Sequence, residues 1–114
     1  MNTPFAACET LADVRSAIDQ IDFMLVGLLA ERGRYVHEAA RFKRNQAEVA
    51  APDRARQVIE QALQHARQMG AAPEVVEAVY RAMVGAFIQL EAAQHDALRQ
   101  AAAGEGTMSG CVAA

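Results

Sequence analysis

The chain has 114 residues, enough for one small domain, and 53 % of them are hydrophobic, so a buried core is feasible. Its alanine-rich composition, with only 5 % aromatic residues, favours helix over strand. A net charge of −3 argues against nucleic acid as the main partner, and no segment approaches the ~18 consecutive apolar residues of a membrane span. Cys8 and Cys111 form no CxxC pair or metal cluster, so we expect a reduced, cytoplasmic protein without metal or cofactor.

The first predicted element is a helix over residues 11–43, preceded by a short lead-in at residues 1–10. One helical face is indicated by positions in steps of three and four, which are apolar except at Arg32: Leu11, Val14, Ile18, Ile21, Leu25, Leu28, Arg32, Tyr35, Ala39 and Phe42. Such a helix is roughly 50 Å long, whereas a compact domain of this size has a radius of gyration of about 13 Å. Because the far end of the helix needs cover, we expect an intertwined homodimer with these helices paired antiparallel.

The stretch RNQAEVAAP at residues 44–52 breaks the helical period and is predicted to be a loop. Pro52 and Asp53 suit the start of a second helix, because proline needs no N–H partner there and an acid favours the positive end. This helix is predicted to run to about Met69 and to stop at Gly70. Its apolar face consists of Val58, Ile59, Ala62, Leu63 and Ala66.

A third helix is predicted to begin at Pro73 and to continue to the end of a single helical domain at residues 11–103. Its apolar residues are Val76, Val79, Tyr80, Met83, Phe87, Leu90 and Ala97. Residues 104–114 are small and polar, and we predict that they are disordered. The expected fold is therefore all-α, a three-helix subunit with one long N-terminal helix.

Two cations fall on the apolar stripe of the first helix. Lys43 follows Arg32 by 11 residues, close to three whole turns, so both side chains point to the same side. An arginine can lay its stem on apolar surface with its head in water, but Lys43 stands just before the predicted loop, where it can face a pocket. Arg15 precedes Arg32 by about 25 Å along the same helix. In an antiparallel dimer, Arg15 of one chain reaches the site around Arg32 of the other, and Arg54 closes that site from across the loop.

Glu91 lies between Phe87 and His95 on a face of the third helix that is otherwise apolar. An exposed glutamate is the simpler alternative; if Glu91 is buried, desolvation favours its protonated form, whereas nearby cations oppose this. Four cations and one candidate proton donor suit a small dianion, such as a dicarboxylate held by arginine forks. No nucleophile–base pair or glycine-rich phosphate loop is visible, and His37, His65 and His95 lack an evident Cys or Ser partner. An enzyme of this kind works by positioning and electrostatics.

A resemblance to the all-helical chorismate mutases is carried by LADVRSAIDQIDFMLVGLLAERGRYVHEAARFK followed by APDR. Within that family the sequence most resembles the branch of salicylate-forming isochorismate-pyruvate lyases. The resemblance covers roughly residues 8–98 and rests on the spacing of the four cations within RSAID, LLAER and the segments that follow. It implies an intertwined dimer of three-helix subunits with two sites.

The resemblance also implies a role for each candidate residue. Arg15 from the partner chain and Arg54 would hold one substrate carboxylate, Arg32 would hold the other, and Lys43 would donate to the ether oxygen. Many family members have glutamine where this chain has Glu91, as a second donor to that oxygen. Because an ionised Glu91 would repel the oxygen, we predict that activity falls as pH rises through the ionisation of Glu91.

The family default is the mutase reaction, the pericyclic conversion of chorismate to prephenate, and the sequence is assigned to it. The alternative is the lyase reaction, which gives salicylate and pyruvate from isochorismate. It is favoured by Ala55, because typical mutases have an acid after the arginine that matches Arg54, whereas the lyases have an apolar residue. A non-catalytic helical dimer is a further alternative, against which the presence of all four cations argues. A lid role for residues 44–52 is a hypothesis from their place between Lys43 and Arg54.

Overall fold

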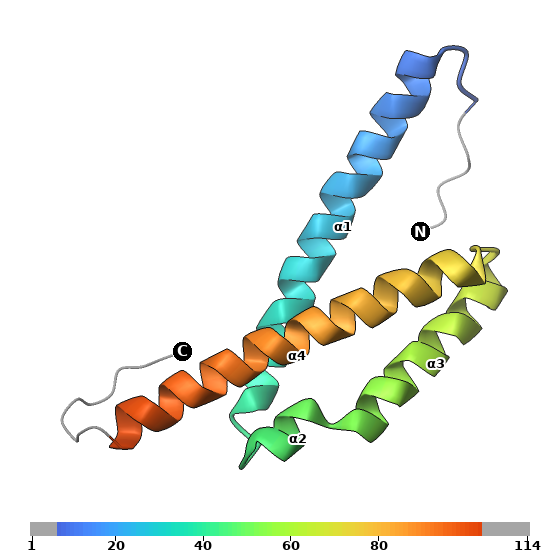
Figure 1. The fold of residues 1–114 in the computed structure, drawn as a ribbon. Coiled ribbons are helices and arrows are strands. Elements are labelled where there is room, and N and C mark those ends of the chain that lie inside the picture. The colour runs from blue at the N-terminus through green and yellow to red at the C-terminus, as the bar shows by residue number, and fades with distance from the viewer. Residues whose placement is uncertain (1–6, 104–114) are drawn as a thin grey trace. The chain divides into compact units, whose positions relative to one another are not determined.

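The computed structural model describes residues 7–103, and every regular element among these residues is a helix (Figure 1). The elements are α1 (Leu11–Ala40), α2 (Gln46–Ala50), α3 (Pro52–Met69) and α4 (Pro73–Ala103). The predicted all-α class with three long helices is confirmed. The predicted disorder at 104–114 and the first six residues of the lead-in lie outside the described residues. None of the helices within residues 7–103 is long and apolar enough to cross a membrane.

The chain divides into two compact units, and the boundary falls within α1, between Arg34 and Tyr35. The N-terminal unit begins with a reciprocal cap. The Thr10 hydroxyl oxygen accepts the Asp13 N–H at 3.1 Å, and the Asp13 carboxylate accepts the Thr10 N–H at 3.2 Å. These bonds satisfy N–H groups that have no partner within the helix, which explains why α1 begins at Leu11.

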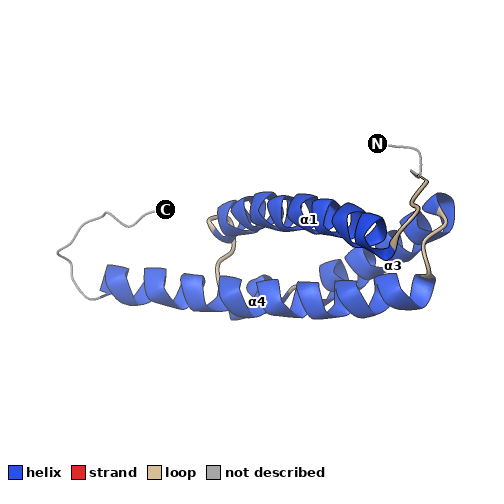
Figure 2. Cartoon of the chain, turned by 90° about the horizontal axis from the view of Figure 1, so that it is seen from above, coloured by secondary structure: helices blue, strands red, loops and turns tan. Residues whose placement is uncertain are grey.

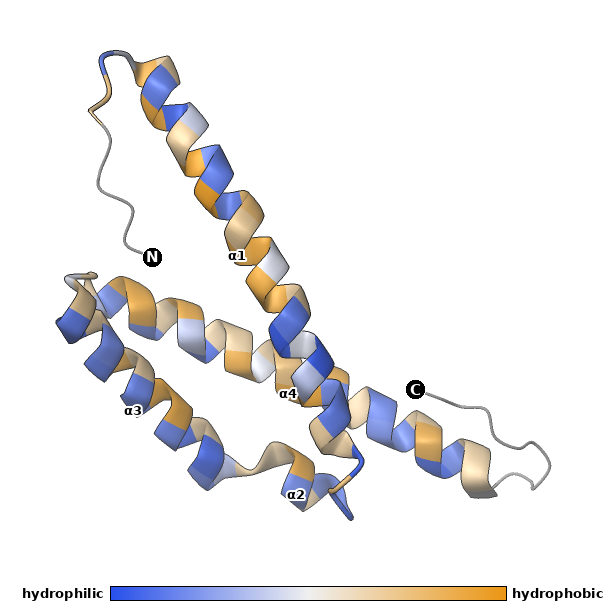
Figure 3. Ribbon diagram, turned by 180° about the vertical axis from the view of Figure 1, so that it is seen from behind, coloured by the Kyte–Doolittle hydropathy of each residue, from blue (hydrophilic) through white to orange (hydrophobic). Residues whose placement is uncertain are grey.

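The apolar stripe of α1 is exposed in the N-terminal unit, and Figure 3 shows apolar residues along this part of the helix. Ile18, Ile21, Leu25 and Leu28 expose between 50 and 61 % of their surface. A single helix cannot bury its own stripe, so these residues need cover from another element or another chain. The intertwined homodimer stays a prediction.

The end of α1 differs from the prediction, because the helix stops at Ala40 and not at Lys43. The next three N–H groups bond to the carbonyl three residues back: Arg41 to Glu38, Phe42 to Ala39, and Lys43 to Ala40, at 3.0–3.2 Å. Such bonds are the tighter 3₁₀ type that commonly closes a helix. Lys43 therefore lies in the turn beyond the helix, not on its stripe.

The prediction of a loop over residues 44–52 is wrong in its middle, where α2 forms. Asn45 caps this helix, since its side-chain oxygen accepts the Glu48 N–H at 3.0 Å. The Glu48 carboxylate in turn accepts the Arg44 N–H at 2.6 Å. Val49 turns inward and is only 2 % exposed, so the burial of one apolar side chain fixes the short helix in place.

Both ends of α3 lie near residues with positive φ. Ala51, at φ 36° and ψ 64°, turns the chain from α2 into α3, and Pro52 occupies the first helical position. Gly70 ends α3 as predicted, at φ 74°, a conformation that glycine adopts without penalty. Its N–H bonds to the Ala66 carbonyl, as in an αL cap, and the Ala71 N–H bonds to the same carbonyl, as in a Schellman cap.

The core of the second unit lies where α2 and α3 pack against α4 (Figures 1 and 2). Its buried apolar residues are Ala40, Val49, Ala62, Ala66 and Val84. The predicted face of α3 is confirmed, because its two alanines are buried and Val58, Ile59 and Leu63 are half-buried.

The predicted apolar face of α4 is only partly correct. Val79 and Leu90 are about half exposed, whereas Val84, which was not in the predicted set, is buried. The buried line continues toward the C-terminus through Glu91 and His95, both less than 10 % exposed. The packing surface of α4 therefore becomes polar toward its C-terminal end. This polar part contacts α2 and the turn between α1 and α2.

Candidate functional site

The central contact of the candidate site joins Lys43 to Glu91. The Lys43 ammonium nitrogen lies 2.9 Å from Oε2 of Glu91, and the two side chains are 25 % and 4 % exposed. Lys43 comes from the turn after α1, and Glu91 from the middle of α4. The alternative of an exposed glutamate at this position is wrong. Oε2 makes no hydrogen bond among the described residues, so the contact is an ion pair by proximity, not a well-aligned hydrogen bond.

His95 lies one turn after Glu91 on α4 and reaches the backbone of Lys43. Its Nε2 lies 3.2 Å from the Lys43 carbonyl oxygen, and the residue is 6 % exposed. Since a carbonyl oxygen can only accept, Nε2 carries the proton in this contact. Nδ1 is buried and has no hydrogen-bond partner among the described residues. Sequence reasoning missed this role, because the partner is a backbone carbonyl that no residue pattern indicates.

A third connection attaches α2 to the same part of α4. The side-chain amide of Gln46 donates to Oδ1 of Asp96 at 2.7 Å and lies 3.4 Å from the Ala92 carbonyl oxygen. Residues 43–49 are therefore held to α4 by an ion pair, two side-chain contacts to backbone carbonyls, a side-chain hydrogen bond and the buried Val49. Residues 43–49 form a docked segment, which includes most of the stretch predicted as a loop at residues 44–52.

Arg54 stands in the first turn of α3, as the sequence predicts, but its surroundings are open. It is exposed, and Nη1 donates to Oε1 of Gln57 at 2.7 Å. Among the described residues it makes no ion pair, and the neighbouring Asp53 pairs with Arg56 instead. Within one chain, Arg54 is a solvent-facing cation that can turn toward a ligand at low cost.

Arg15 and Arg32 both lie on α1 in the N-terminal unit, whereas Lys43, Arg54 and Glu91 belong to the second unit. Arg15 is exposed and Arg32 is half-buried. The structure thus brings together Lys43 and Glu91 from the predicted set. The assembly of all five residues into one site stays a prediction.

Arg44 and Glu48 form an ion pair within the docked segment, residues 43–49. Hydrogen bonds from the Arg44 side chain and backbone to Glu48 hold the pKa of that carboxyl below its usual value, and the same pair raises the pKa of Arg44. The two guanidinium contacts measure 2.7 and 3.0 Å. Arg44 is therefore paired with Glu48 of α2, whereas the neighbouring cation, Lys43, contacts Glu91 of α4.

The chemistry available around Lys43 is donation to an oxygen that gains negative charge. An ammonium group has three donors, so contact with Glu91 leaves donors for a ligand oxygen. Glu91 is buried beside it, where a carboxylate acts as an acceptor or, when protonated, as a donor. Among residues 7–103, no group of three or more His, Cys, Asp or Glu side chains is placed to hold a metal ion.

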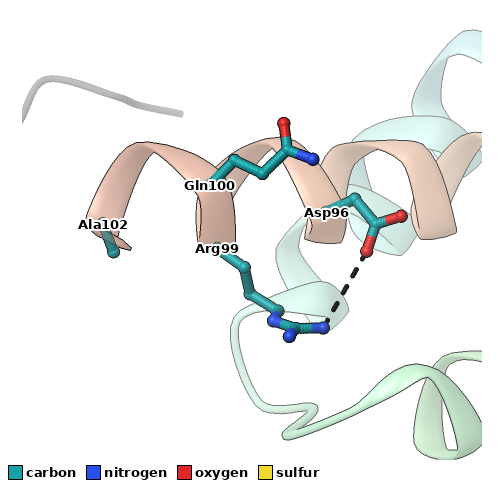
Figure 4. A pocket seen from close by; sticks show the side chains of 4 residues that line it. All are labelled: Asp96, Arg99, Gln100 and Ala102. Atoms are coloured by element: carbon teal, nitrogen blue, oxygen red, sulfur yellow. Dashed lines mark ion pairs between the residues drawn. The ribbon is translucent and has the colours of Figure 1, made fainter. Parts of the chain in front are cut away.

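A surface pocket near the C-terminal end of α4 does not coincide with this site (Figure 4). It is lined by Asp96, Arg99, Gln100 and Ala102, and none of these is a predicted site residue. Nη1 of Arg99 lies 4.0 Å from Oδ1 of Asp96, so the cation of the pocket already faces a carboxylate. One cation offset by one acid does not suit a dianion.

The chain is similar to a known protein family and to a known protein. Residues 14–92 match the family described as chorismate mutase type II. An isochorismate pyruvate lyase from Pseudomonas aeruginosa is 35 % identical over 88 residues, which cover 77 % of this chain and 86 % of that protein. The family match includes all five predicted site residues and ends before His95.

Proposed function

Because the chain belongs to the chorismate mutase type II family, and is an enzyme of the chorismate mutase or related lyase type, we propose that its reaction is pericyclic and that isochorismate is its preferred substrate. The products would be salicylate and pyruvate. This reverses the order in which the sequence alone placed the two reactions. The non-catalytic dimer is set aside, since the family and the relative are enzymes by name.

The observation that best supports a pericyclic reaction at this site is the Lys43–Glu91 contact. In both reactions of the family the ether C–O bond breaks, and negative charge grows on the departing enolpyruvyl oxygen. A fixed ammonium group beside that oxygen binds the transition state more tightly than the substrate, which is what accelerates the reaction. The 2.9 Å contact with a buried carboxylate holds the Lys43 ammonium group at one place on α4.

The proposed reaction needs no residue that forms a covalent bond. As the ether bond breaks, one ring hydrogen moves to the methylene carbon of the enolpyruvyl group, which becomes the methyl group of pyruvate. The ring loses that hydrogen and the ether oxygen and becomes aromatic, so the atoms of isochorismate are divided between salicylate and pyruvate. No water, oxidant or nucleophile enters, in keeping with a site built from cations and one carboxyl group.

Two observations favour isochorismate over chorismate. The residue after Arg54 is Ala55, which is apolar and offers no acceptor to a ring hydroxyl. The relative that is 35 % identical is named as an isochorismate pyruvate lyase. The mutase reaction remains the second candidate, because the matched family is described by that activity and the charge pattern that Lys43 would stabilise is the same.

The remaining cations would complete the site across a homodimer. Arg32 would hold one carboxylate of the substrate, while Arg54 and Arg15 of the second chain would hold the other. Supporting this, the stripe of α1 exposes apolar residues that a second copy of the helix could cover. Arg15 and Arg32 are about 25 Å apart on one helix, so only a second chain brings an Arg15 to the site around Arg32.

The test is to incubate the purified protein with isochorismate and with chorismate separately and to separate the products by chromatography. Salicylate with equimolar pyruvate from isochorismate, formed faster than prephenate from chorismate, is the expected result. Prephenate as the faster product would transfer the assignment to the mutase reaction. Conversion of neither substrate would refute both.

A further inference from the structure

We propose that α4 holds Lys43 at both ends, with Glu91 opposite its ammonium group and His95 on its backbone carbonyl, so that His95 is a positioning residue for catalysis. The inference rests on the proposed function, because it assigns to Lys43 the stabilisation of the departing oxygen. His95 itself touches neither substrate nor reacting atoms in this account. It acts through the backbone of Lys43.

The need for a second attachment follows from where Lys43 lies. The residue is beyond the last helical position of α1, and its N–H is bonded to the Ala40 carbonyl at 3.2 Å. Its own carbonyl has no helical successor to bond, because the chain turns toward α2. A lysine side chain has four rotatable carbon–carbon bonds, so its ammonium group is placed accurately only if the backbone beneath it is fixed.

His95, on α4, fixes the backbone of Lys43 in this way. Nε2 reaches the Lys43 carbonyl oxygen at 3.2 Å, and the residue is only 6 % exposed. Glu91 and His95 are four residues apart on one helix and therefore lie on the same face, about one turn from each other. The two side chains can therefore contact the same residue at two places, the ammonium group and the carbonyl oxygen of Lys43.

The buried position of His95 argues against a passive role as filler. Its Nδ1 has no hydrogen-bond partner among the described residues, so the imidazole gives up hydrogen bonds to water to make one contact. An apolar side chain would fill the same volume without that loss. Unlike an apolar side chain, the imidazole has an N–H donor at Nε2, which reaches the Lys43 carbonyl oxygen.

A matched pair of substitutions separates the donor from the volume. His95→Gln keeps an N–H donor at the reach of Nε2, and His95→Leu keeps a similar volume without a donor. We expect His95→Leu to lower kcat about 10- to 100-fold with KM within about twofold, because a small displacement of a catalytic group affects the transition state most. His95→Gln should restore kcat to within about threefold of the wild-type value.

Nitrogen NMR of the wild-type protein tests the contact without relying on activity. The Nε2–H tautomer of His95 is expected, since the carbonyl can only accept. Finding the Nδ1–H tautomer would overturn the proposal, even if the variants fail to fold. Unchanged kcat in a folded His95→Leu protein would overturn it as well, as would an equal loss in both variants. If the wild-type protein converts neither substrate, the proposed function has failed, and the Nδ1–H tautomer of His95 would still rule out the attachment to the Lys43 carbonyl.

Discussion

The ammonium nitrogen of Lys43 lies 2.9 Å from Oε2 of Glu91, and this contact ties the turn after α1 to the buried face of α4. The carboxylate side chain is only 4 % exposed, so the pair is largely removed from water on one side. Removing one partner of such a pair leaves the other charge buried and unpaired, which destabilises the folded protein. Its two members are also the residues that would face the departing oxygen. A single substitution therefore changes stability and activity together, and a double substitution is needed to separate the two effects.

Glu91→Gln and Glu91→Met test whether a hydrogen-bond donor is needed beside the ether oxygen. Glutamine has an N–H donor at this position and methionine has none, so we expect turnover to survive in Glu91→Gln and to fall in Glu91→Met. Initial rates with isochorismate, measured on the wild-type protein and both variants, check this. An equal loss in both variants would show that a donor at this position is not what matters.

Lys43→Met should lower kcat by about 10²–10³, which is the loss seen when one donor to a developing oxyanion is removed. It should also reduce the free energy of unfolding by about 3 kcal/mol at most, because Glu91 is left buried without its counter-charge. Arg41→Met is the control for charge, since Arg41 lies two residues earlier and its side chain is 63 % exposed.

The double variant Lys43→Met/Glu91→Met separates the two effects. It removes both charges, so it should recover much of the lost stability while turnover stays absent. Denaturant unfolding and steady-state rates are measured on the same samples. Turnover that persists in the double variant would exclude Lys43 from the reaction.

Ala51→Gly should stabilise the protein by about 1 kcal/mol. Ala51 is the non-glycine residue with positive φ among the described residues, at 36°, and a Cβ atom is disfavoured in that conformation. Ala78→Gly, at an exposed position inside α4, is the matched control and should destabilise by about 1 kcal/mol. Equal losses in both variants would mean that Ala51 is not strained in solution.

The Arg44–Glu48 pair should make stability depend on pH in acid. Hydrogen bonds from Arg44 lower the pKa of Glu48 in the folded state, so the folded protein favours the carboxylate more than the unfolded chain does. This contribution is present above the unfolded pKa and is lost as pH falls through the folded pKa. Glu48→Gln should therefore lower the melting temperature at neutral pH and leave it nearly unchanged in acid. Glu60→Gln, on the exposed face of α3, serves as the comparison.

The sequence predicted the long helices well because their signals are local. Apolar residues in steps of three and four placed α1, and Pro52 and Gly70 marked the limits of α3. The helix α2 was missed although its signal is present, since Asn45 followed by Glu48 is the pattern of a cap with an acid three residues later. The apolar period breaks at residues 44–52, which hides so short a helix.

The candidate site was less predictable, because its contacts join residues far apart in the chain. Spacing and resemblance singled out Lys43 and Glu91, which are 2.9 Å apart in the structure. The role of His95 could not be predicted, because its partner is the Lys43 carbonyl, a group that every residue has. Likewise, nothing in the sequence pairs Gln46 with Asp96 across 50 residues.

The most direct test of the whole account mixes two inactive variants, Arg15→Ala and Arg32→Ala, after unfolding and joint refolding. Each homodimer lacks one cation at both sites. In a mixed dimer, one site has both arginines and the other has neither. We predict that each variant alone is inactive with isochorismate and that the equimolar mixture regains about a quarter of the wild-type rate, because half the dimers are mixed and each has one complete site. A mixture no more active than its components would contradict a site shared between two chains.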